Sequence, residues 1–233
     1  GEASDAMDSA RTLFARGEAR SAKKRLDEAS RIYRDILRSN PEQRDAAVGL
    51  SAVLFLEKRY PDGVALMRPF HERLPDDADV SHQLGLHLYR SGEQELAVPL
   101  LESVAGDPKR FDAMWLLLQH YYRLANWQAG LVHAERYLVA RPDDVESLAL
   151  IGTYFLKAEQ FDRAVQTLDR FLDAHPGNVP ARINRANALF RKGSFELAGQ
   201  EYERLLEEQP DKSRFLYNLA SVRIKQDRCE EAL

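Results

Sequence analysis

The sequence predicts an all-α protein, a solenoid in which antiparallel helix pairs stack one on the next. Three observations support this prediction. A proline recurs at a nearly constant spacing, small residues recur at two fixed offsets from the prolines, and apolar residues between these markers follow a helical period. Such a repeat indicates similar structural units, each of which packs mainly against its neighbours.

The prolines set the length of the repeat unit. They fall 33 or 34 residues apart, at Pro41, Pro75, Pro108, Pro142, Pro176 and Pro210. A proline cannot continue a helix and disfavours helical geometry just before itself, so each is predicted to close the second helix of a unit. Polar residues that can cap the next helix follow in four units, at Asp76, Asp143, Asn178 and Ser213.

Two further series consist of small side chains, which predict that helix backbones approach closely. One runs through Ala29, Gly63, Ala97, Gly130, Ala164, Ala198 and Ala232. The other lies twelve residues earlier and runs through Gly17, Ser51, Gly85, Leu118, Gly152, Ala186 and Ala220. Leu118 is the one large member, and we expect its extra volume to be accommodated across the helix pair, at Gly130.

Apolar residues between the markers have the spacing of two amphipathic helices per unit. The example is Leu148, Ile151 and Phe155, followed by Phe161, Val165, Leu168, Phe171 and Leu172. Pro61 and Pro180 are expected at helix starts and Pro99 in a first turn, where proline is tolerated. Pro69 falls in the middle of a second helix, so a kink is predicted there.

This pattern resembles the tetratricopeptide repeat (TPR), a unit of 34 residues with small residues at positions 8 and 20 and a proline at position 32. Aromatic residues at positions 17 and 24 agree with it, namely Tyr60, Trp127, Phe161 and Phe195, and then Tyr33 and Tyr202. The ankyrin signature is missing, and HEAT units are longer. The resemblance implies an α-α superhelix, a right-handed solenoid with a concave groove lined by first helices.

The resemblance covers nearly the whole chain, which we expect to form a single solenoid domain, 1–233. The predicted repeats are 10–43, 44–77, 78–110, 111–144, 145–178 and 179–212, with a partial repeat 213–233. Residues 1–9 are expected as an N-terminal helical extension.

Composition narrows the possible partners. The chain has 33 Lys and Arg against 37 Asp and Glu, which lacks the basic excess typical of nucleic-acid binding, although a local patch is compatible with it. No apolar run reaches the length of a membrane-spanning helix, and residues 1–10 lack a signal-peptide pattern, so no direct membrane insertion is expected. The compartment, cytoplasmic or periplasmic, stays open. Cys229 is expected to be a buried small hydrophobe.

No pattern in the sequence predicts catalysis. The six histidines lack zinc-ligand spacing, and the glycines belong to the repeat and form no phosphate-binding loop. Adjacent carboxylates such as Asp76 and Asp77 lie at repeat junctions, where acidic helix starts explain them. We therefore expect no catalytic residue, no metal and no cofactor, and a protein that is not an enzyme.

The resemblance implies that a partner peptide or helix binds in the groove. The corresponding positions are His82, Gln83, Leu86, Tyr89, Arg90, Trp115, Gln119, Tyr122, Arg123, Thr153, Lys157, Asn184, Asn187, Arg191, Tyr217 and Asn218. Position 13 forms a basic row of Arg90, Arg123, Lys157, Arg191 and Lys225. This row either selects an acidic partner or is an ordinary solvated face of the family. Position 5 carries no lysine, so the carboxylate clamp of chaperone-binding members is not inferred.

Three functions are compatible with these observations. The first is a protein–protein interaction scaffold that holds a partner in its groove. The alternative is the TPR region of a larger bacterial envelope protein, for polysaccharide export or pilus assembly, whose active or pore domain lies elsewhere. The third is self-association through an uncapped C-terminal end.

Overall fold

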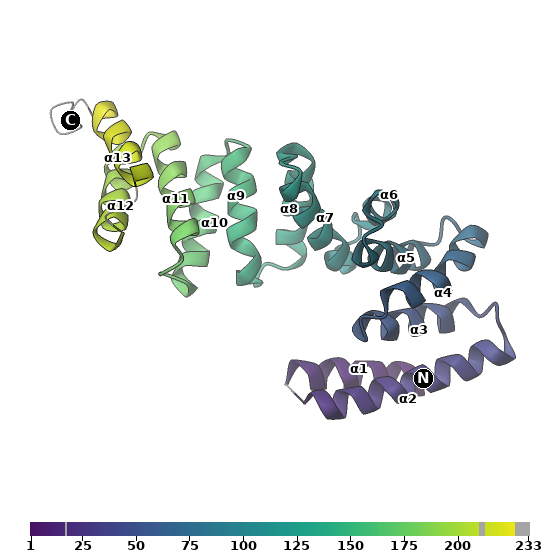
Figure 1. Cartoon of the computed structure of the whole chain (residues 1–233). Helices are drawn as coiled ribbons and strands as arrows, with labels where there is room; N and C mark the ends of the chain where they lie inside the picture. The colour runs from purple at the N-terminus through teal and green to yellow at the C-terminus, as the bar shows by residue number, and fades with distance from the viewer. Residues whose placement is uncertain (17, 210–212, 227–233) are drawn as a thin grey trace. The chain divides into compact units, whose positions relative to one another are not determined.

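The computed structural model describes residues 1–16, 18–209 and 213–226. Within these residues the protein contains thirteen α-helices, two short 3-10 helices and no strand (Figure 1). The prediction of an all-α fold is confirmed. Gly17, Pro210, Cys229 and Ala232, and with them the second helix of the partial repeat, lie outside the described residues.

Short connections join the helices into hairpins. In order they are α1 Glu2–Ala15, α2 Ala19–Ser39, α3 Arg44–Leu56, α4 Tyr60–Arg73, α5 Ala78–Ser91, α6 Gln94–Val104, η1 Pro108–Arg110, α7 Phe111–Arg123, α8 Trp127–Ala140, η2 Val145–Ser147, α9 Leu148–Lys157, α10 Phe161–Ala174, α11 Val179–Lys192, α12 Phe195–Glu208 and α13 Ser213–Lys225. From α3 onwards, the odd-numbered helices are the first helices of the repeats. Five of them begin at the repeat starts that the sequence predicts. In the remaining case, α9, the 3-10 helix η2 just before it begins at the repeat start.

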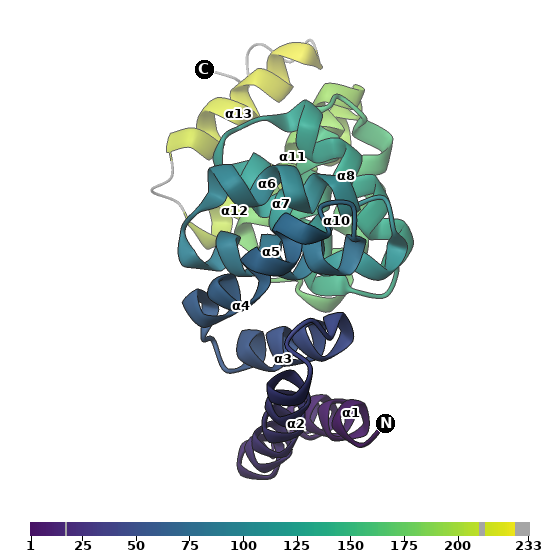
Figure 2. The same ribbon diagram turned by 90° about the vertical axis from the view of Figure 1, so that its right-hand side faces the viewer.

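The chain forms two compact halves, an N-terminal half of residues 1–117 and a C-terminal half of residues 118–233. Consecutive helices pack against one another from α1 to α6 in the N-terminal half and from α8 to α13 in the C-terminal half, as α1 and α2 do in both views (Figures 1 and 2). First helices also contact each other, α3 with α5 and α9 with α11. Within each half, these first helices therefore lie side by side as a layer.

Helix starts follow local sequence signals. Aromatic residues open α4, α8, α10 and α12, the second helices of four repeats. Asn178 caps α11 as expected, because its side chain accepts a hydrogen bond from the backbone of Ala181 at 3.0 Å. The expectations for Asp76 and Asp143 are wrong by one residue: Asp77 caps α5, and Asp144 precedes η2. After Pro75 and Pro142, the turn is one residue longer than the cap assignment assumed.

The first hairpin departs from the repeat pattern. Residues 2–9, expected in an extension, form the first turns of α1 itself. The reason is an apolar stripe on α1: Ala6, Met7 and Ala10 are buried against Leu26 and Ala29 of α2. Residues 19–25 bury only Ala22, so the stripe on residues 2–15 makes the better partner for α2.

Two prolines lie inside helices. α4 runs through Pro69 to Arg73 as a single helix, and the kink expected at Pro69 stays a prediction. Pro99 is the sixth residue of α6, beyond the first turn, so its expected position is wrong. A proline there removes one backbone hydrogen bond, and α6 ends five residues later at Val104.

Glycines at position 20 leave room for aromatic rings of the next repeat. A Cβ atom at Gly63 would lie closer than 3.0 Å to the ring of His87, and one at Gly130 equally close to the ring of Tyr154. Both rings reach through the gap to a backbone carbonyl 36 residues earlier. His87 Nε2 bonds the carbonyl of Ser51 at 3.1 Å, and the Tyr154 hydroxyl donates to the carbonyl of Leu118 at 2.5 Å.

The same contact corrects the expectation for Leu118. The space beside Gly130 is filled by the ring of Tyr154, from the following repeat. Leu118 is fully buried and contributes its backbone carbonyl to this contact. The absence of a side chain at Gly130 thus allows Tyr154 to pack at the junction between two repeats.

Acidification is expected to destabilise the N-terminal half through His87. Burial lowers the pKa of His87, partly offset by its hydrogen bond to Ser51. Between the ordinary histidine pKa near 6.5 and this lowered value, the unfolded chain binds a proton that the folded chain does not. The free energy of unfolding should therefore fall with pH below about 6.5, by up to about 1.4 kcal/mol per pH unit.

Urea unfolding of the wild type and of His87→Phe, at about pH 7.5 and about pH 5.5, measures this effect. The variant keeps a ring against Gly63 but loses the titrating group, so its stability should depend less on pH. An identical pH dependence in the two proteins would show that His87 is not responsible.

Candidate binding groove

The predicted groove residues come from first helices in both halves. His82, Gln83, Leu86, Tyr89 and Arg90 lie on α5, and Trp115 lies on α7, all in the N-terminal half. The remaining ten lie in the C-terminal half, on α7, α9, α11 and α13.

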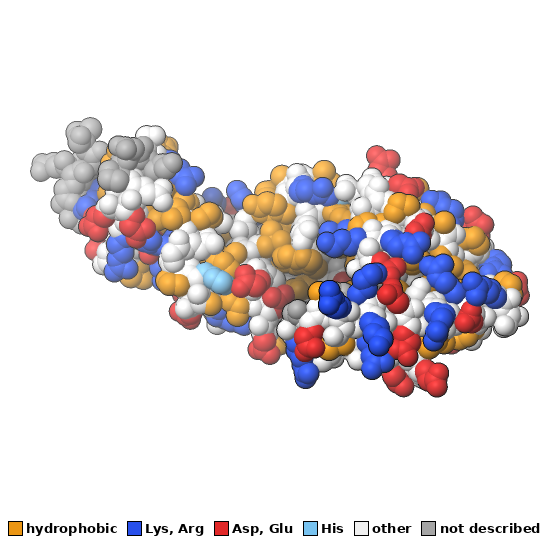
Figure 3. Space-filling view, turned by 60° about the horizontal axis from the view of Figure 1, so that its bottom comes forward, with side chains coloured by type: hydrophobic (Ala, Val, Ile, Leu, Met, Phe, Trp, Pro, Cys, Tyr) orange, Lys and Arg blue, Asp and Glu red, His pale blue; other side chains and the backbone are white. Residues whose placement is uncertain are grey.

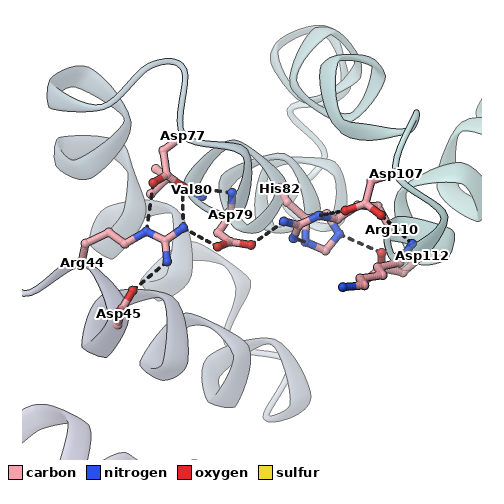
Figure 4. A network of polar contacts seen from close by, with 10 residues as sticks. Arg44, Asp45, Asp77, Asp79, Val80, His82, Asp107, Arg110 and Asp112 are labelled. Atoms are coloured by element: carbon pink, nitrogen blue, oxygen red, sulfur yellow. Dashed lines mark hydrogen bonds and ion pairs between the residues drawn. The ribbon is translucent and has the colours of Figure 1, made fainter.

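In the N-terminal half, the starts of three first helices are joined by ion pairs (Figure 4). Arg44, at the start of α3, bonds both oxygens of Asp77, at 2.8 and 2.9 Å, and also contacts Asp79. Asp77 is at the same time the cap of α5. Hydrogen bonding to Arg44 lowers the pKa of the Asp77 carboxyl, so the carboxylate stays charged at neutral pH.

His82 extends this network to the next repeat. Its Nε2 atom lies 2.7 Å from Asp112, and its Nδ1 atom lies 3.0 Å from the guanidinium of Arg110, which also bonds Asp79. A guanidinium only donates, so Nδ1 accepts and Nε2 carries the proton that His82 donates to Asp112. Burial raises the pKa of the Asp112 carboxyl, but the hydrogen bond and electrostatic interaction with His82, together with the backbone amides of Asp112 and Ala113, outweigh burial, and the net pKa is lowered.

These contacts leave few groups of the N-terminal half available to a partner. Both ring nitrogens of His82 are bonded within the protein, and Gln83 accepts a hydrogen bond from Ser51 at 3.2 Å. Leu86 and Tyr89 are buried. Arg90 is exposed, and Trp115 is half-buried.

In the C-terminal half, three first helices and one second helix surround a cavity of about 590 Å³. Its lining is Leu156, Lys157, Glu159, Asn187, Phe190, Arg191, Tyr202, Tyr217, Asn218, Ser221, Ile224 and Lys225. Five of the predicted groove residues meet here: Lys157, Asn187, Arg191, Tyr217 and Asn218. The lining combines aromatic rings, side-chain amides and a surplus of cations.

The cations of this cavity are held in place to different degrees. Arg191 pairs with Glu159 at 2.5 Å and lies over the ring of Phe161. Lys157 lies over the ring of Trp127, with its Nζ atom 5.5 Å from the ring centre. For Lys225, no ion pair is found within the part of the chain that the structure describes. Among the described residues, Glu159 is the only acid in the lining, and this part of the lining carries a net positive charge.

One of the tyrosines in the lining forms a hydrogen bond with one of the side-chain amides. Tyr202 is buried, and its hydroxyl donates to the side-chain oxygen of Asn187 at 2.6 Å. That bond fixes the amide of Asn187 so that its NH₂ group is free to donate elsewhere. Tyr217 is 75% exposed, which leaves most of its ring available for contact.

The other predicted residues of this half do not line the cavity. Thr153 is buried and accepts a hydrogen bond from Asn184 at 2.9 Å, so these two residues bind each other. Tyr122 packs edge-on against Trp127 and Tyr154. Gln119 is half-buried, and Arg123 is exposed.

Part of the lining is absent from the predicted groove residues. Tyr202 is one of the aromatic residues that match the repeat at position 24, and its hydroxyl end reaches the cavity. Glu159 lies in the loop between α9 and α10, and Ile224 lies near the end of α13. For Tyr202, the signal in the sequence is a tyrosine at a repeat position that is apolar in most of the other repeats. A buried tyrosine needs a hydrogen-bond partner for its hydroxyl group, which indicates a polar site nearby.

The described residues contain no group of three or more His, Cys, Asp or Glu side chains arranged to hold a metal ion. None of the described helices combines the length and the apolar character needed to cross a membrane.

Comparison with known proteins identifies related folds. The tetratricopeptide repeat model matches residues 8–78 and 150–213. Among solved structures, YrrB, described as a TPR protein with an unusual peptide-binding site, is 16% identical with a TM-score of 0.65, over 79% of this chain and 96% of YrrB. MamA from AMB-1 is 26% identical with a TM-score of 0.54, over 65% of this chain and 90% of MamA. Comparison with curated proteins finds no match.

Proposed function

We propose that this chain, which belongs to the tetratricopeptide repeat family, is a non-catalytic interaction scaffold that holds an acidic peptide segment of a partner protein in the cavity of its C-terminal half. One observation carries the proposal. The cavity of about 590 Å³ brings together three cations, two side-chain amides and three aromatic rings from successive first helices and α12.

The lining matches the chemistry of an extended peptide. The amides of Asn187 and Asn218 can bond a peptide backbone, which presents donors and acceptors along its length. Phe190 and Tyr217 offer aromatic surface for an apolar or aromatic anchor, the kind of residue that dominates binding energy at interfaces. YrrB, a protein of the same fold, is described as binding a peptide, which supports this class of ligand.

The charge of the cavity favours acidic partners. In the part of the chain that the structure describes, its lining has Lys157, Arg191 and Lys225 against one acid, Glu159, and the formal net charge of the whole chain is −4. A local positive cavity on a negative protein attracts acidic segments and disfavours basic ones. We therefore infer that the basic row read from the sequence contributes to partner selection in this half.

Two cavity variants test the proposal. Peptides that bind the full chain are selected from a random library, and their affinities are measured by fluorescence anisotropy. We expect acidic sequences, and a loss of affinity of at least about tenfold in Tyr217→Ala and in Lys225→Glu, because one removes an aromatic anchor and the other reverses a charge. Both side chains are exposed, so neither change should unfold the protein.

Arg204→Glu is the matched control. Arg204 is an exposed cation on α12 of the same half, and it lies outside this cavity. The Arg204→Glu variant should bind the selected peptides with the affinity of the wild type. If the peptides show no acidic bias, or bind Tyr217→Ala and Lys225→Glu unchanged, the cavity is not the binding site.

A further inference from the structure

Helix α2 carries positive charge that the rest of the chain does not share. Its 21 residues include seven Lys or Arg and three Asp or Glu. The whole chain has 33 basic and 37 acidic residues, so the other residues have 26 and 34. A helix of formal charge +4 therefore belongs to a chain whose remainder has a charge of −8.

The basic residues form a stripe along one side of α2. With about 3.6 residues per turn, Arg20, Lys24, Arg31 and Arg38 lie within about 40° of one another around the helix axis. The stripe extends for about 27 Å, from the 1.5 Å rise per residue. Figure 3 shows Lys and Arg side chains gathered, with acidic ones between them, over the end that carries α1 and α2.

This side of α2 is not needed for packing. Ala22, Leu26 and Ala29 are the buried residues of the helix, and they lie on the opposite side. The large hydrophobic residue of α2 that is exposed, Ile36, also lies away from the stripe. The stripe therefore presents charge without an apolar residue that could insert into a partner.

Several of these cations are free to bind. Lys23 pairs with Asp27 at 3.5 Å, Arg25 with Glu28 at 2.8 Å and Arg38 with Asp35 at 2.6 Å, and all three pairs are exposed to solvent. Such pairs contribute little and exchange readily. For Arg20, Lys24 and Arg31, which are exposed, no ion pair is found among the residues that the structure describes.

We propose that the stripe on α2 is a docking surface for an anionic lipid bilayer, which it binds at the surface without insertion. Each basic residue held near an anionic membrane contributes to binding, and a straight stripe can bring several into contact with a flat surface at once. The inference is independent of the peptide cavity, which lies in the other half of the chain.

The acids within the stripe favour a bilayer over a nucleic acid. Asp27 and Asp35 lie among the basic residues. The phosphates of a nucleic acid have fixed spacing, so some would face these carboxylates. Headgroups in a fluid bilayer diffuse laterally, gather at Arg20 and Arg31, and avoid the acids.

Vesicle co-sedimentation tests the proposal on the full chain. Vesicles of phosphatidylcholine with about 30% phosphatidylserine are compared with phosphatidylcholine alone, at about 50 mM and about 500 mM salt. We expect binding only to the anionic vesicles and only at low salt. The triple variant Arg20→Glu, Lys24→Glu and Arg31→Glu should lose at least about 100-fold in affinity, because each residue contributes about fivefold.

A control variant with the same change of net charge carries Lys109→Glu, Arg136→Glu and Arg204→Glu, at exposed cations outside α2. It should lose far less affinity, and circular dichroism should show both variants folded. The corresponding glutamine triple variant, which leaves no reversed charge on α2, should also bind weakly. The proposal is overturned if the wild type ignores anionic vesicles, if the control loses as much, or if duplex DNA binds more tightly than vesicles.

Discussion

Gly130→Ala is expected to destabilise the C-terminal half by about 2 to 3 kcal/mol, the upper part of the range seen for overpacked cores. Glycine to alanine inside a helix ordinarily stabilises a protein by up to about 1 kcal/mol, so the expected sign is reversed. The cause is the ring of Tyr154, which would lie closer than 3.0 Å to the new Cβ atom.

The ring has little freedom to move away. Tyr154 is fully buried, its hydroxyl group is bonded to the carbonyl of Leu118, and its ring contacts those of Tyr122 and Trp127. A shift large enough to admit a methyl group would break the hydrogen bond and leave the buried hydroxyl group of Tyr154 without its acceptor. Urea unfolding of the full chain, with hydrogen exchange of α8 and α9 amides, measures the effect.

Gly199→Ala is the matched control. Gly199 also lies early in a second helix, α12, but its Cβ atom would meet only a methyl group of Val222, at 3.3 Å. This substitution should be neutral or slightly stabilising. In the double variant Gly130→Ala, Tyr154→Ala, the loss in the free energy of unfolding should be smaller than the sum of the two single losses. The reason is that the clash disappears when the ring is removed. Equal stability of Gly130→Ala and the wild type would show that the ring adjusts freely.

The repeat pattern was sufficient for the helices because its signals are local. A proline, an aromatic helix start or a small residue constrains the backbone within a few residues, and the helix starts follow these signals closely. The departures have non-local causes. In the first hairpin, a stripe of alanine and methionine on α1 selects the pairing with α2, and the partner of Gly130 lies in the next repeat.

The candidate site could be predicted only in part, for the same reason. Repeat positions place a residue on the layer of first helices, but they do not say which polar groups are already bonded. His82 and Lys157 are both predicted groove residues, yet His82 is bonded to Arg110 and Asp112 while Lys157 lines a cavity. Those bonds depend on ion pairs between repeats, 28 and 30 residues apart in the chain.

Arg182→Ala is expected to cost about 3 to 5 kcal/mol, the usual cost of leaving one member of a buried ion pair alone. Arg182 on α11 bonds Glu201 of α12 at 2.6 Å, and both side chains are about nine-tenths buried. The same guanidinium bonds both oxygens of Glu208 at 2.7 Å. Without it, Glu201 would keep only Arg185, at 3.7 Å, as a charged partner.

Lys192→Ala provides a control on the same helix. Lys192 pairs with Asp162, but both side chains are well exposed, so this change should cost less than about 1 kcal/mol. The double variant Arg182→Met, Glu201→Leu should recover most of the lost stability, because it removes both buried charges and keeps the volume. Urea unfolding of the four proteins separates two explanations. If the double variant is as unstable as Arg182→Ala, then α11 and α12 need this ion pair for their packing, and the cost does not come from a stranded carboxylate.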